Sequence, residues 1–353
     1  MITAGIDIGS RAAKAVILKD DQVLSSAIGD TGAESVKAAY SVAAKALDGT
    51  GLTIEKFDYT VATGYGRVLV PFADENVSEI SCHAKGVSYY FPSVKTILDM
   101  GGQDCKAINC DSEGRVTNFV MNDKCAGGTG RFLEMIADVL GIPLNRIGST
   151  SLESVSPVPF NTICAVFART EALTYMRKGA ARSDILSGLH EAIAVRSVNL
   201  LKRISIEKDF TITGGISKNS GLVRKLAEKV GMEPLLSEDP QLTGALGAAL
   251  FARDRLLGVS GTAGTAQYGY SDATGEYFIT VDGPLCDGCG KCVDACPAGL
   301  LAMEKMDGAA RPVVKREMSK RLGFLCPGYD VCRARNSLNC HSACTKGAIK
   351  HSW

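Results

Sequence analysis

The first 257 residues alternate short apolar runs with longer amphipathic segments. In the longer segments apolar residues recur at intervals near 3.6, which is typical of helices that cover a core with one face. The short runs have the length of buried strands, and their alternation with helices predicts an α/β body. The predicted strands are residues 2–8, 13–18, 58–63, 95–100 and 210–213, and the predicted helices are residues 34–47, 131–140, 168–178, 183–203, 219–230 and 241–256.

Two of the predicted strands end in the same way. The run Gly5-Ile6-Asp7-Ile8-Gly9-Ser10 is echoed about 90 residues later by Leu98-Asp99-Met100-Gly101-Gly102-Gln103-Asp104. Each is an apolar strand that ends in Asp-x-Gly. This echo predicts two related lobes within the body.

The chain changes character after residue 257. Residues 258–275 are small, polar and rich in glycine, which is typical of a linker. From residue 276 the sequence is rich in cysteine, lysine and arginine and shows little apolar periodicity. The sequence therefore predicts an α/β body over residues 1–257, a linker over residues 258–275 and a small domain over residues 276–353.

The composition of the 353-residue chain is that of an ordinary globular protein, with 46% hydrophobic and 22% charged residues. The formal net charge of +1 favours neither nucleic acid nor an anionic membrane as a partner. No apolar run reaches the roughly 18–20 residues of a membrane span, and Met1-Ile2-Thr3 leads into a predicted strand rather than a signal peptide. We therefore expect a cytoplasmic protein without a membrane partner. In that reducing compartment, 13 cysteines favour metal ligation over disulfides.

Two sets of four cysteines dominate the C-terminal domain. The first set, followed by Pro297, has the spacing C-x2-C-x2-C-x3-C-P, which favours iron–sulfur ligation over zinc. The second set has a wider loop and no proline after its last cysteine. The pattern resembles a bacterial two-cluster ferredoxin, and the resemblance implies that the two sets exchange one cysteine. The implied ligands of the two 4Fe–4S clusters are Cys286, Cys289, Cys292 and Cys344 for one, and Cys326, Cys332, Cys340 and Cys296 for the other.

Three glycine-containing turns of the body are candidates for a nucleotide site. An aspartate after a strand can hold Mg²⁺ or its waters, and a glycine lets backbone N–H groups approach phosphate oxygens. The third turn, Thr213-Gly214-Gly215, offers bare backbone to a purine or ribose. Each turn alone is equally an ordinary turn, but the three together resemble the superfamily of sugar kinases, actin and heat-shock chaperone ATPases. The resemblance implies that ATP and Mg²⁺ face Asp7, Gly9, Ser10, Asp99, Gly101, Gly102 and Gln103, with the adenosine on Gly214 and Gly215.

Two further cysteines of the body, Cys125 and Cys164, precede predicted helices. The run from Asn122 to Arg131 suits a phosphate, because helix N-termini attract anions. It also suits a thiolate, because the helix dipole lowers the pKa of a cysteine and the glycines leave room for a cluster. A buried apolar thiol is the structural alternative for both residues.

Several runs of the body are similar to the activator ATPases of 2-hydroxyacyl-CoA dehydratases and to the ATPase subunits of benzoyl-CoA reductase. The resemblance implies that two subunits share one 4Fe–4S cluster, with Cys125 and Cys164 as this chain's ligands. It also implies a second ATPase subunit, identical or paralogous, and a CoA-ester reductase or dehydratase as partner. The fused ferredoxin domain departs from the compact activators. The similar runs are residues 63–67, 80–84, 99–104, 122–133 and 164–171.

The expected function is ATP-driven transfer of single electrons, from a reduced ferredoxin or flavodoxin to a CoA-ester reductase of the benzoyl-CoA type. Activation of a 2-hydroxyacyl-CoA dehydratase or a related double-cubane reductase is the alternative. A sugar or acyl kinase with a redox-sensing domain is a third reading. A two-cluster domain favours continuous electron supply and hence the first reading.

Some residues keep a functional and a structural interpretation side by side. Lys14 contacts a phosphate or caps a solvated strand, and Gln103 orients the attacking water or has a structural role. We expect the remaining cysteines and the body histidines to be structural, namely Cys82, Cys105, Cys110, His83 and His190.

Overall fold

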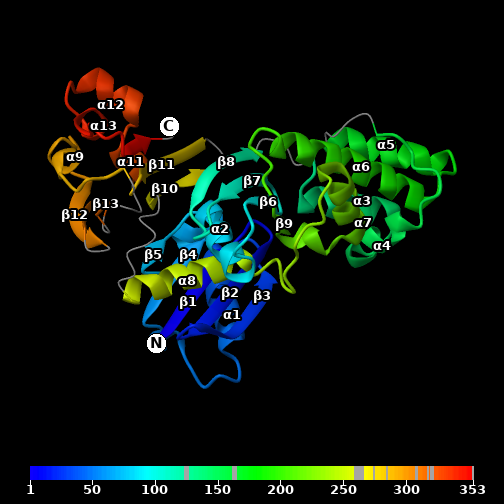
Figure 1. The fold of residues 1–353 in the computed structure, drawn as a ribbon, viewed down its shortest axis with the longest axis horizontal. Helices are drawn as coiled ribbons and strands as arrows, with labels where there is room; N and C mark the ends of the chain where they lie inside the picture. The colour runs from blue at the N-terminus through cyan, green and yellow to red at the C-terminus, as the bar shows by residue number, and fades with distance from the viewer. Residues whose placement is uncertain are drawn as a thin grey trace. The chain divides into compact units, whose positions relative to one another are not determined.

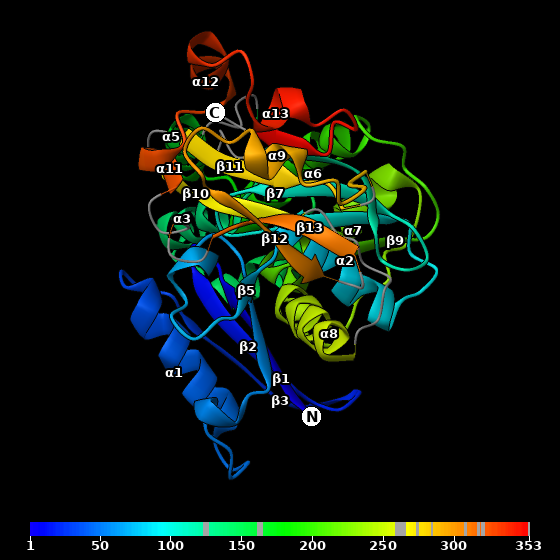
Figure 2. The same cartoon turned by 90° about the vertical axis from the view of Figure 1, so that its left-hand side faces the viewer.

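The computed structural model describes residues 1–122, 127–160, 165–257, 266–272, 275–283, 285–306, 309–315, 318 and 322–351. The chain divides into two compact units. Figures 1 and 2 label the helices and strands of the chain. The first comprises Met1–Ile8, Ala13–Cys82 and Ala248–Trp353, and the second comprises Gly9–Ala12 and His83–Gly247.

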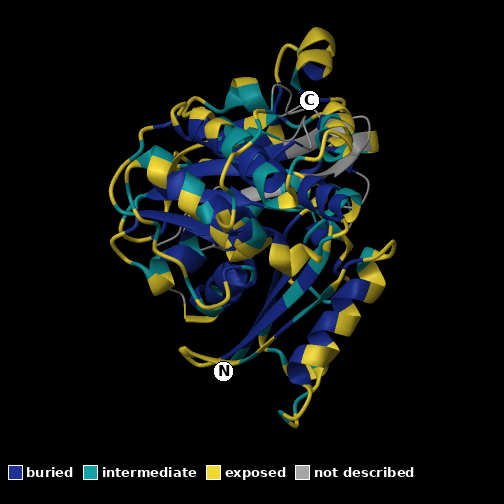
Figure 3. Ribbon diagram, turned by 90° about the vertical axis from the view of Figure 1, so that its right-hand side faces the viewer, coloured by how far each residue is buried: buried dark blue, intermediate teal, exposed yellow. Residues whose placement is uncertain are grey.

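A five-stranded sheet with the order β3-β2-β1-β4-β5 forms the N-terminal part of the first unit. Its central strand β1 is buried from its second residue onward, as expected for an uninterrupted apolar run. Helix α1 packs its alanine-rich face on this sheet and exposes its opposite face (Figure 3). The elements are β1 (Ile2–Ile8), β2 (Ala12–Lys19), β3 (Gln22–Asp30), α1 (Ser35–Leu47), β4 (Tyr59–Thr63) and β5 (Glu75–Asn76).

A four-stranded sheet with the order β8-β7-β6-β9 forms the second unit together with its helices. The core of this unit packs sheet residues such as Leu98 and Ile212 against helix residues such as Phe132 and Leu189. The elements are β6 (Thr96–Met100), β7 (Cys105–Cys110), β8 (Val116–Asn122), α3 (Gly130–Leu140), α4 (Ile147–Leu152), α5 (Ala165–Arg177), α6 (Arg182–Leu201), β9 (Phe210–Thr213) and α7 (Ser220–Val230). The division between the units falls within α2 (Glu79–Tyr90) and α8 (Thr243–Leu257).

The two sheets repeat one pattern of strand pairing. In the first, β1 pairs with β2 in antiparallel and with β4 in parallel orientation. In the second, β6 pairs with β7 in antiparallel and with β9 in parallel orientation. The pairing confirms that the echo around Asp7 and Asp99 marks related parts of the body.

The C-terminal region is a small α+β assembly with a core of its own. Its strands form the sheet β10-β11-β14 and the hairpin β12-β13, and its helices have four to seven residues. The elements are β10 (Ala266–Asp272), β11 (Gly275–Val281), α9 (Lys291–Asp294), β12 (Leu301–Met306), β13 (Ala309–Val314), α11 (Leu322–Leu325), α12 (Tyr329–Arg335), α13 (Cys340–Ala343) and β14 (Ile349–His351). Among the described residues, no helix combines the length and the apolarity that crossing a membrane requires.

Part of the predicted linker belongs to this region. Residues 266–272 form β10, which pairs with β11 in antiparallel register from Ala266↔Val281 to Asp272↔Gly275. The linker expectation is therefore wrong for these residues, because backbone pairing in a hairpin tolerates the small polar side chains that suggested a flexible segment. Residues 258–265 lie outside the described part of the chain.

Candidate functional site

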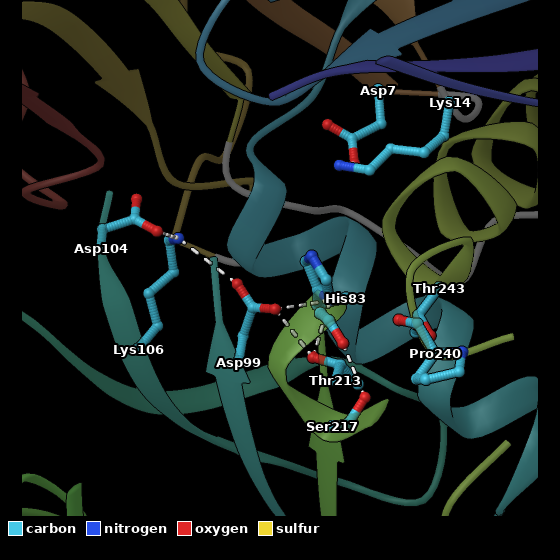
Figure 4. Close-up of polar contacts among 11 residues, drawn as sticks. Asp7, Lys14, His83, Asp99, Asp104, Lys106, Thr213, Ser217, Pro240 and Thr243 are labelled. Atoms are coloured by element: carbon cyan, nitrogen blue, oxygen red, sulfur yellow. Dashed lines mark hydrogen bonds and ion pairs between the residues drawn. The ribbon is translucent and has the colours of Figure 1, made fainter. Parts of the chain in front are cut away.

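The first candidate half-site lies at the carboxyl end of β1. Strand register places Asp7 opposite Lys14 on β2 and opposite Thr63 on β4. The Lys14 ammonium donates to Asp7 Oδ2 at 2.9 Å, and both side chains are largely buried (Figure 4). The Lys14 ammonium thus offsets the Asp7 charge at Oδ2, and the other carboxylate oxygen, Oδ1, is not part of this contact.

Gly64, the residue after Thr63, lies directly against Asp7 and Ile8 in this half-site. Its φ of +83° is in the left-handed region, and an added Cβ would lie 2.7 Å from the Ile8 carbonyl oxygen and clash with Asp7 Oδ1. Only a glycine lets this backbone approach the aspartate so closely.

The second half-site, at the carboxyl end of β6, repeats the first. Strand register places Asp99 opposite Lys106 on β7 and opposite Thr213 on β9. Lys106 is 1% exposed, and its ammonium lies 3.4 Å from Asp99 Oδ2 and 2.8 Å from Asp104 Oδ1 (Figure 4). A cation this deeply buried is stable only where carboxylates surround it. The lysine therefore holds both aspartates in place.

His83 extends this network from α2. Thr213 Oγ1 donates its proton to Asp99 Oδ1 at 2.9 Å and also lies 3.0 Å from His83 Nδ1. A hydroxyl has one proton, so the Thr213 oxygen accepts from His83 and Nδ1 carries the imidazole proton. His83 is therefore a positioning residue for Asp99, in keeping with its expected structural role.

Gly214, which follows Thr213, is the counterpart of Gly64. Its φ is +86°, and an added Cβ would clash with the Met100 carbonyl oxygen and lie 3.2 Å from Asp99 Oδ1. Its amide donates to the Pro240 carbonyl at 3.1 Å. Gly215, the other glycine expected at the adenosine, is exposed.

We expect Gly214→Ala to destabilise the second unit more than Gly231→Ala does. Both glycines have positive φ, but a Cβ at Gly231 has nothing within 4 Å, so that variant isolates the conformational cost of about 1–2 kcal/mol. At Gly214 the backbone clash adds to this cost. Urea unfolding of the two variants measures the difference, and equal free energies of unfolding would contradict the close approach.

The remaining predicted phosphate-loop residues come together within the second unit. The Gly101 amide donates to the Asp104 carbonyl at 3.0 Å, and an added Cβ at Gly102 would lie 3.0 Å from Ser10 Oγ. The Gly9 amide donates to the Ala12 carbonyl at 3.1 Å. Gln103 is exposed to solvent at the edge of this group.

Helix α3 begins on this loop. The amides of Gly130 and Arg131 donate to the carbonyls of Gly101 and Gly102, each at 3.0 Å. One turn later, Glu134 accepts from the Arg11 Nε at 3.0 Å. Cys125, which precedes α3 in sequence, and Cys164, which precedes α5, lie outside the described residues.

The other body cysteines are buried, as expected for core thiols. Burial raises the pKa of Cys110 to about 11 and that of Cys105 to about 12, and it raises the pKa of Cys82 further. These thiols therefore stay protonated at neutral pH. His190 is likewise internal and hydrogen-bonded to Ser151 and Asn219, and burial lowers its pKa to about 3.

The eight C-terminal cysteines line two separate cavities. Cys286, Cys289, Cys292 and Cys344 line one, and Cys296, Cys326, Cys332 and Cys340 line the other. These are the sets that exchange of one cysteine between the two motifs implies. Four thiols around one cavity have the donor chemistry of a 4Fe–4S cubane, so the residues present fit such a cluster.

The crowding of these thiols has an electrostatic cost. Burial, and after it the charge of the neighbouring cysteines, raises the pKa of Cys292 to about 11 and that of Cys340 to about 12. Four thiolates in one cavity need a cationic centre to offset their repulsion, and metal binding displaces their protons.

The sequence reasoning missed Lys106, Thr63 and Thr213 as members of the half-sites. The sequence did contain a signal for Lys106. Asp7 and Lys14 are seven residues apart, and Asp99 and Lys106 have the same separation. The dipeptide Thr-Gly also ends the parallel neighbour strand in both halves.

Two family models match the chain. The model of the BadF/BadG/BcrA/BcrD ATPase family matches residues 4–252, and a 4Fe-4S binding domain model matches residues 278–301. The 2-hydroxyisocaproyl-CoA dehydratase activator of Clostridioides difficile is 42% identical over 72% of this chain and 96% of its own length. A benzoyl-CoA reductase subunit of Thauera aromatica is 32% identical over 71% of this chain and 94% of its own length.

A solved structure gives the same result. The activator of the 2-hydroxyisocaproyl-CoA dehydratase from Clostridium difficile with bound ADPNP is 42% identical, covers 72% of this chain and 95% of its own, and has a TM-score of 0.69. The comparisons confirm the predicted fold class and the resemblance to activators and reductase ATPase subunits. They also confirm the predicted function as an ATPase with an iron–sulfur domain for electron transfer, and they support both of its readings.

Proposed function

Because the chain belongs to the BadF/BadG/BcrA/BcrD ATPase family, we propose that it uses ATP to deliver single electrons to a CoA-ester reductase or dehydratase. When bound, ATP supplies free energy and iron–sulfur clusters carry the electrons. The observation that carries the proposal is the repeated half-site, in which each aspartate at a strand end is held by a buried lysine and approached by a glycine.

We assign the nucleotide to these half-sites. Asp7 and Asp99 would hold Mg²⁺ or its waters, and the ion pairs with Lys14 and Lys106 orient the two carboxylates. Gln103, exposed beside Gly101 and Gly102, would orient the attacking water. Gly9, Ser10, Gly101 and Gly102 would face the phosphates, and Gly214 and Gly215 would face the adenosine.

Three clusters serve the electron transfer in this proposal. Two would be held by the cavities of the C-terminal region, which receive electrons from a reduced ferredoxin or flavodoxin. The third would be shared with a second ATPase subunit, identical or paralogous, through Cys125 and Cys164. Because α3 begins on the Gly101–Gly102 loop, a change in phosphate occupancy would shift the helix that follows Cys125. A cytoplasmic location and the domain limits 1–257 and 276–353 stay predictions.

The two readings differ in how many electrons each product requires. A reductase of the benzoyl-CoA type consumes electrons at every turnover, whereas an activated dehydratase keeps one electron for many turnovers. A built-in two-cluster domain suits continuous supply, and we favour the reductase reading for this reason. A fixed small ratio of ATP to product supports the reductase, and a vanishing ratio supports the activator.

Iron counting tests the shared cluster. We expect about ten iron atoms per chain in the wild type, and about two fewer in Cys125→Ala and in Cys164→Ala, because half of one cubane is lost. The control is Cys110→Ala, a buried body thiol that should leave the iron content unchanged. Unchanged iron in Cys125→Ala would exclude the shared cluster and favour the kinase reading.

A further inference from the structure

The two cysteine-lined cavities of the C-terminal region differ in the side chains around them. The described residues lining the cavity of Cys296, Cys326, Cys332 and Cys340 include the cation Arg335 and the aromatic Phe324, and none of them is a carboxylate. Those lining the cavity of Cys286, Cys289, Cys292 and Cys344 include Asp287 beside Lys346. The first cavity is therefore bordered by positive charge and apolar surface, and the second by balanced charge.

Phe324 marks the first cavity as a contact surface. Phe324 is 88% exposed and borders a cavity that also carries Arg335. Aromatic residues beside an arginine contribute much of the binding energy at protein interfaces.

A cation stacks on a second aromatic residue of this cavity, Tyr329. On α12 the Arg333 guanidinium lies 5.8 Å from the centroid of the Tyr329 ring, and Tyr329 lines the same cavity. The Tyr329 ring also packs against the ring of His341, with centroids 4.1 Å apart. Arg333 and Arg335 are both exposed, and the same helix carries one exposed carboxylate, Asp330. Because its contact with Tyr329 restricts the Arg333 side chain before binding, less conformational entropy is lost when a partner's carboxylate binds this arginine.

We propose that Phe324, Tyr329, Arg333 and Arg335 form the docking surface for the electron donor, which is a small acidic electron-carrier protein. The inference rests on the proposed function, and it adds that electrons enter at the cavity of Cys296, Cys326, Cys332 and Cys340. Each encounter transfers one electron, so the donor is oxidised by one electron, the chain is reduced by one, and no bond or proton changes. Positive charge at the surface steers the acidic donor toward it and makes association depend on salt.

Affinity of the full-length holoprotein for an acidic bacterial two-cluster ferredoxin tests this surface. With the ferredoxin labelled and oxidised, fluorescence anisotropy at low salt should show about tenfold weaker binding to Arg333→Glu and to Phe324→Ser than to wild type. Lys346→Glu reverses a charge at the other cavity and should change the affinity less than about twofold. High salt should weaken wild-type binding and have little effect on Arg333→Glu.

Reduction rates provide the second readout. The reduced ferredoxin should reduce the two substituted proteins more slowly than wild type, whereas dithionite, which needs no docking surface, should reduce all variants alike when rates are expressed per iron bound. The proposal is wrong if Lys346→Glu has the larger effect, if neither variant changes the affinity, or if Phe324→Ser alters the oligomeric state instead. ATP-dependent electron delivery by wild type charged with dithionite tests the proposed function separately.

Discussion

Replacing Asp99 with asparagine should lower ATP turnover by about a hundredfold, a loss comparable to removal of a preorganised electrostatic group from an active site. The amide keeps the size of the side chain and its contact with Thr213, but it removes the negative charge that would hold Mg²⁺ and that balances Lys106. Phosphate release measured at saturating ATP and Mg²⁺ gives the effect on kcat.

A matched control separates this effect from loss of a surface carboxylate. Asp111 belongs to the same unit and accepts from Arg115 at 2.7 Å on the exposed surface. Asp111→Asn should leave turnover within about twofold of wild type. A threefold or smaller loss in Asp99→Asn would remove Asp99 from the nucleotide site.

Replacing Lys106 with methionine should cost about 3–5 kcal/mol in free energy of unfolding. Methionine fits the volume but leaves the buried Asp99 carboxylate and the half-buried Asp104 carboxylate side by side without the lysine cation. Lys14→Met should cost less, because Lys14 is more exposed and its ion pair involves a single carboxylate, that of Asp7.

Urea unfolding of both variants measures these costs. The double variant Lys106→Met/Asp104→Asn should recover part of the loss, since one of the two uncompensated charges is removed with the lysine. If Lys106→Met is as stable as wild type, the lysine does not hold the two aspartates, and the half-sites are not equivalent.

The hydrophobic pattern predicted the elements that carry the half-sites. Strands β1 and β6 are short, mostly apolar runs, and such runs are typical of the buried strands of an α/β protein. The partner lysine on β7, Lys106, was not predictable in the same way, because lysine is rarely fully buried. Only the strand register shows that it faces Asp99.

Helix α2 was missed for a related reason. A glycine near its middle, Gly86, interrupts the helical pattern, and an added Cβ there would clash with the Thr243 carbonyl at the start of α8. The close approach of two backbone segments depends on the tertiary structure, and the sequence around Gly86 does not reveal it. The resemblance of the C-terminal cysteine pattern to two-cluster ferredoxins carried more information, since it implied which thiols would line the same cavity.

The repeated pairing of strands also bears on the ancestry of the molecule. Two hairpins with the same Asp–Lys register and the same Thr-Gly neighbour are what duplication and fusion of one gene leave behind. The surroundings of the two threonines differ, because Thr213 contacts His83 whereas Thr63 lies beside the thiol of Cys82, and both of these residues belong to the single helix α2. Reconstructed ancestral halves should retain the Asp–Lys pair and the Thr-Gly dipeptide, which both halves carry.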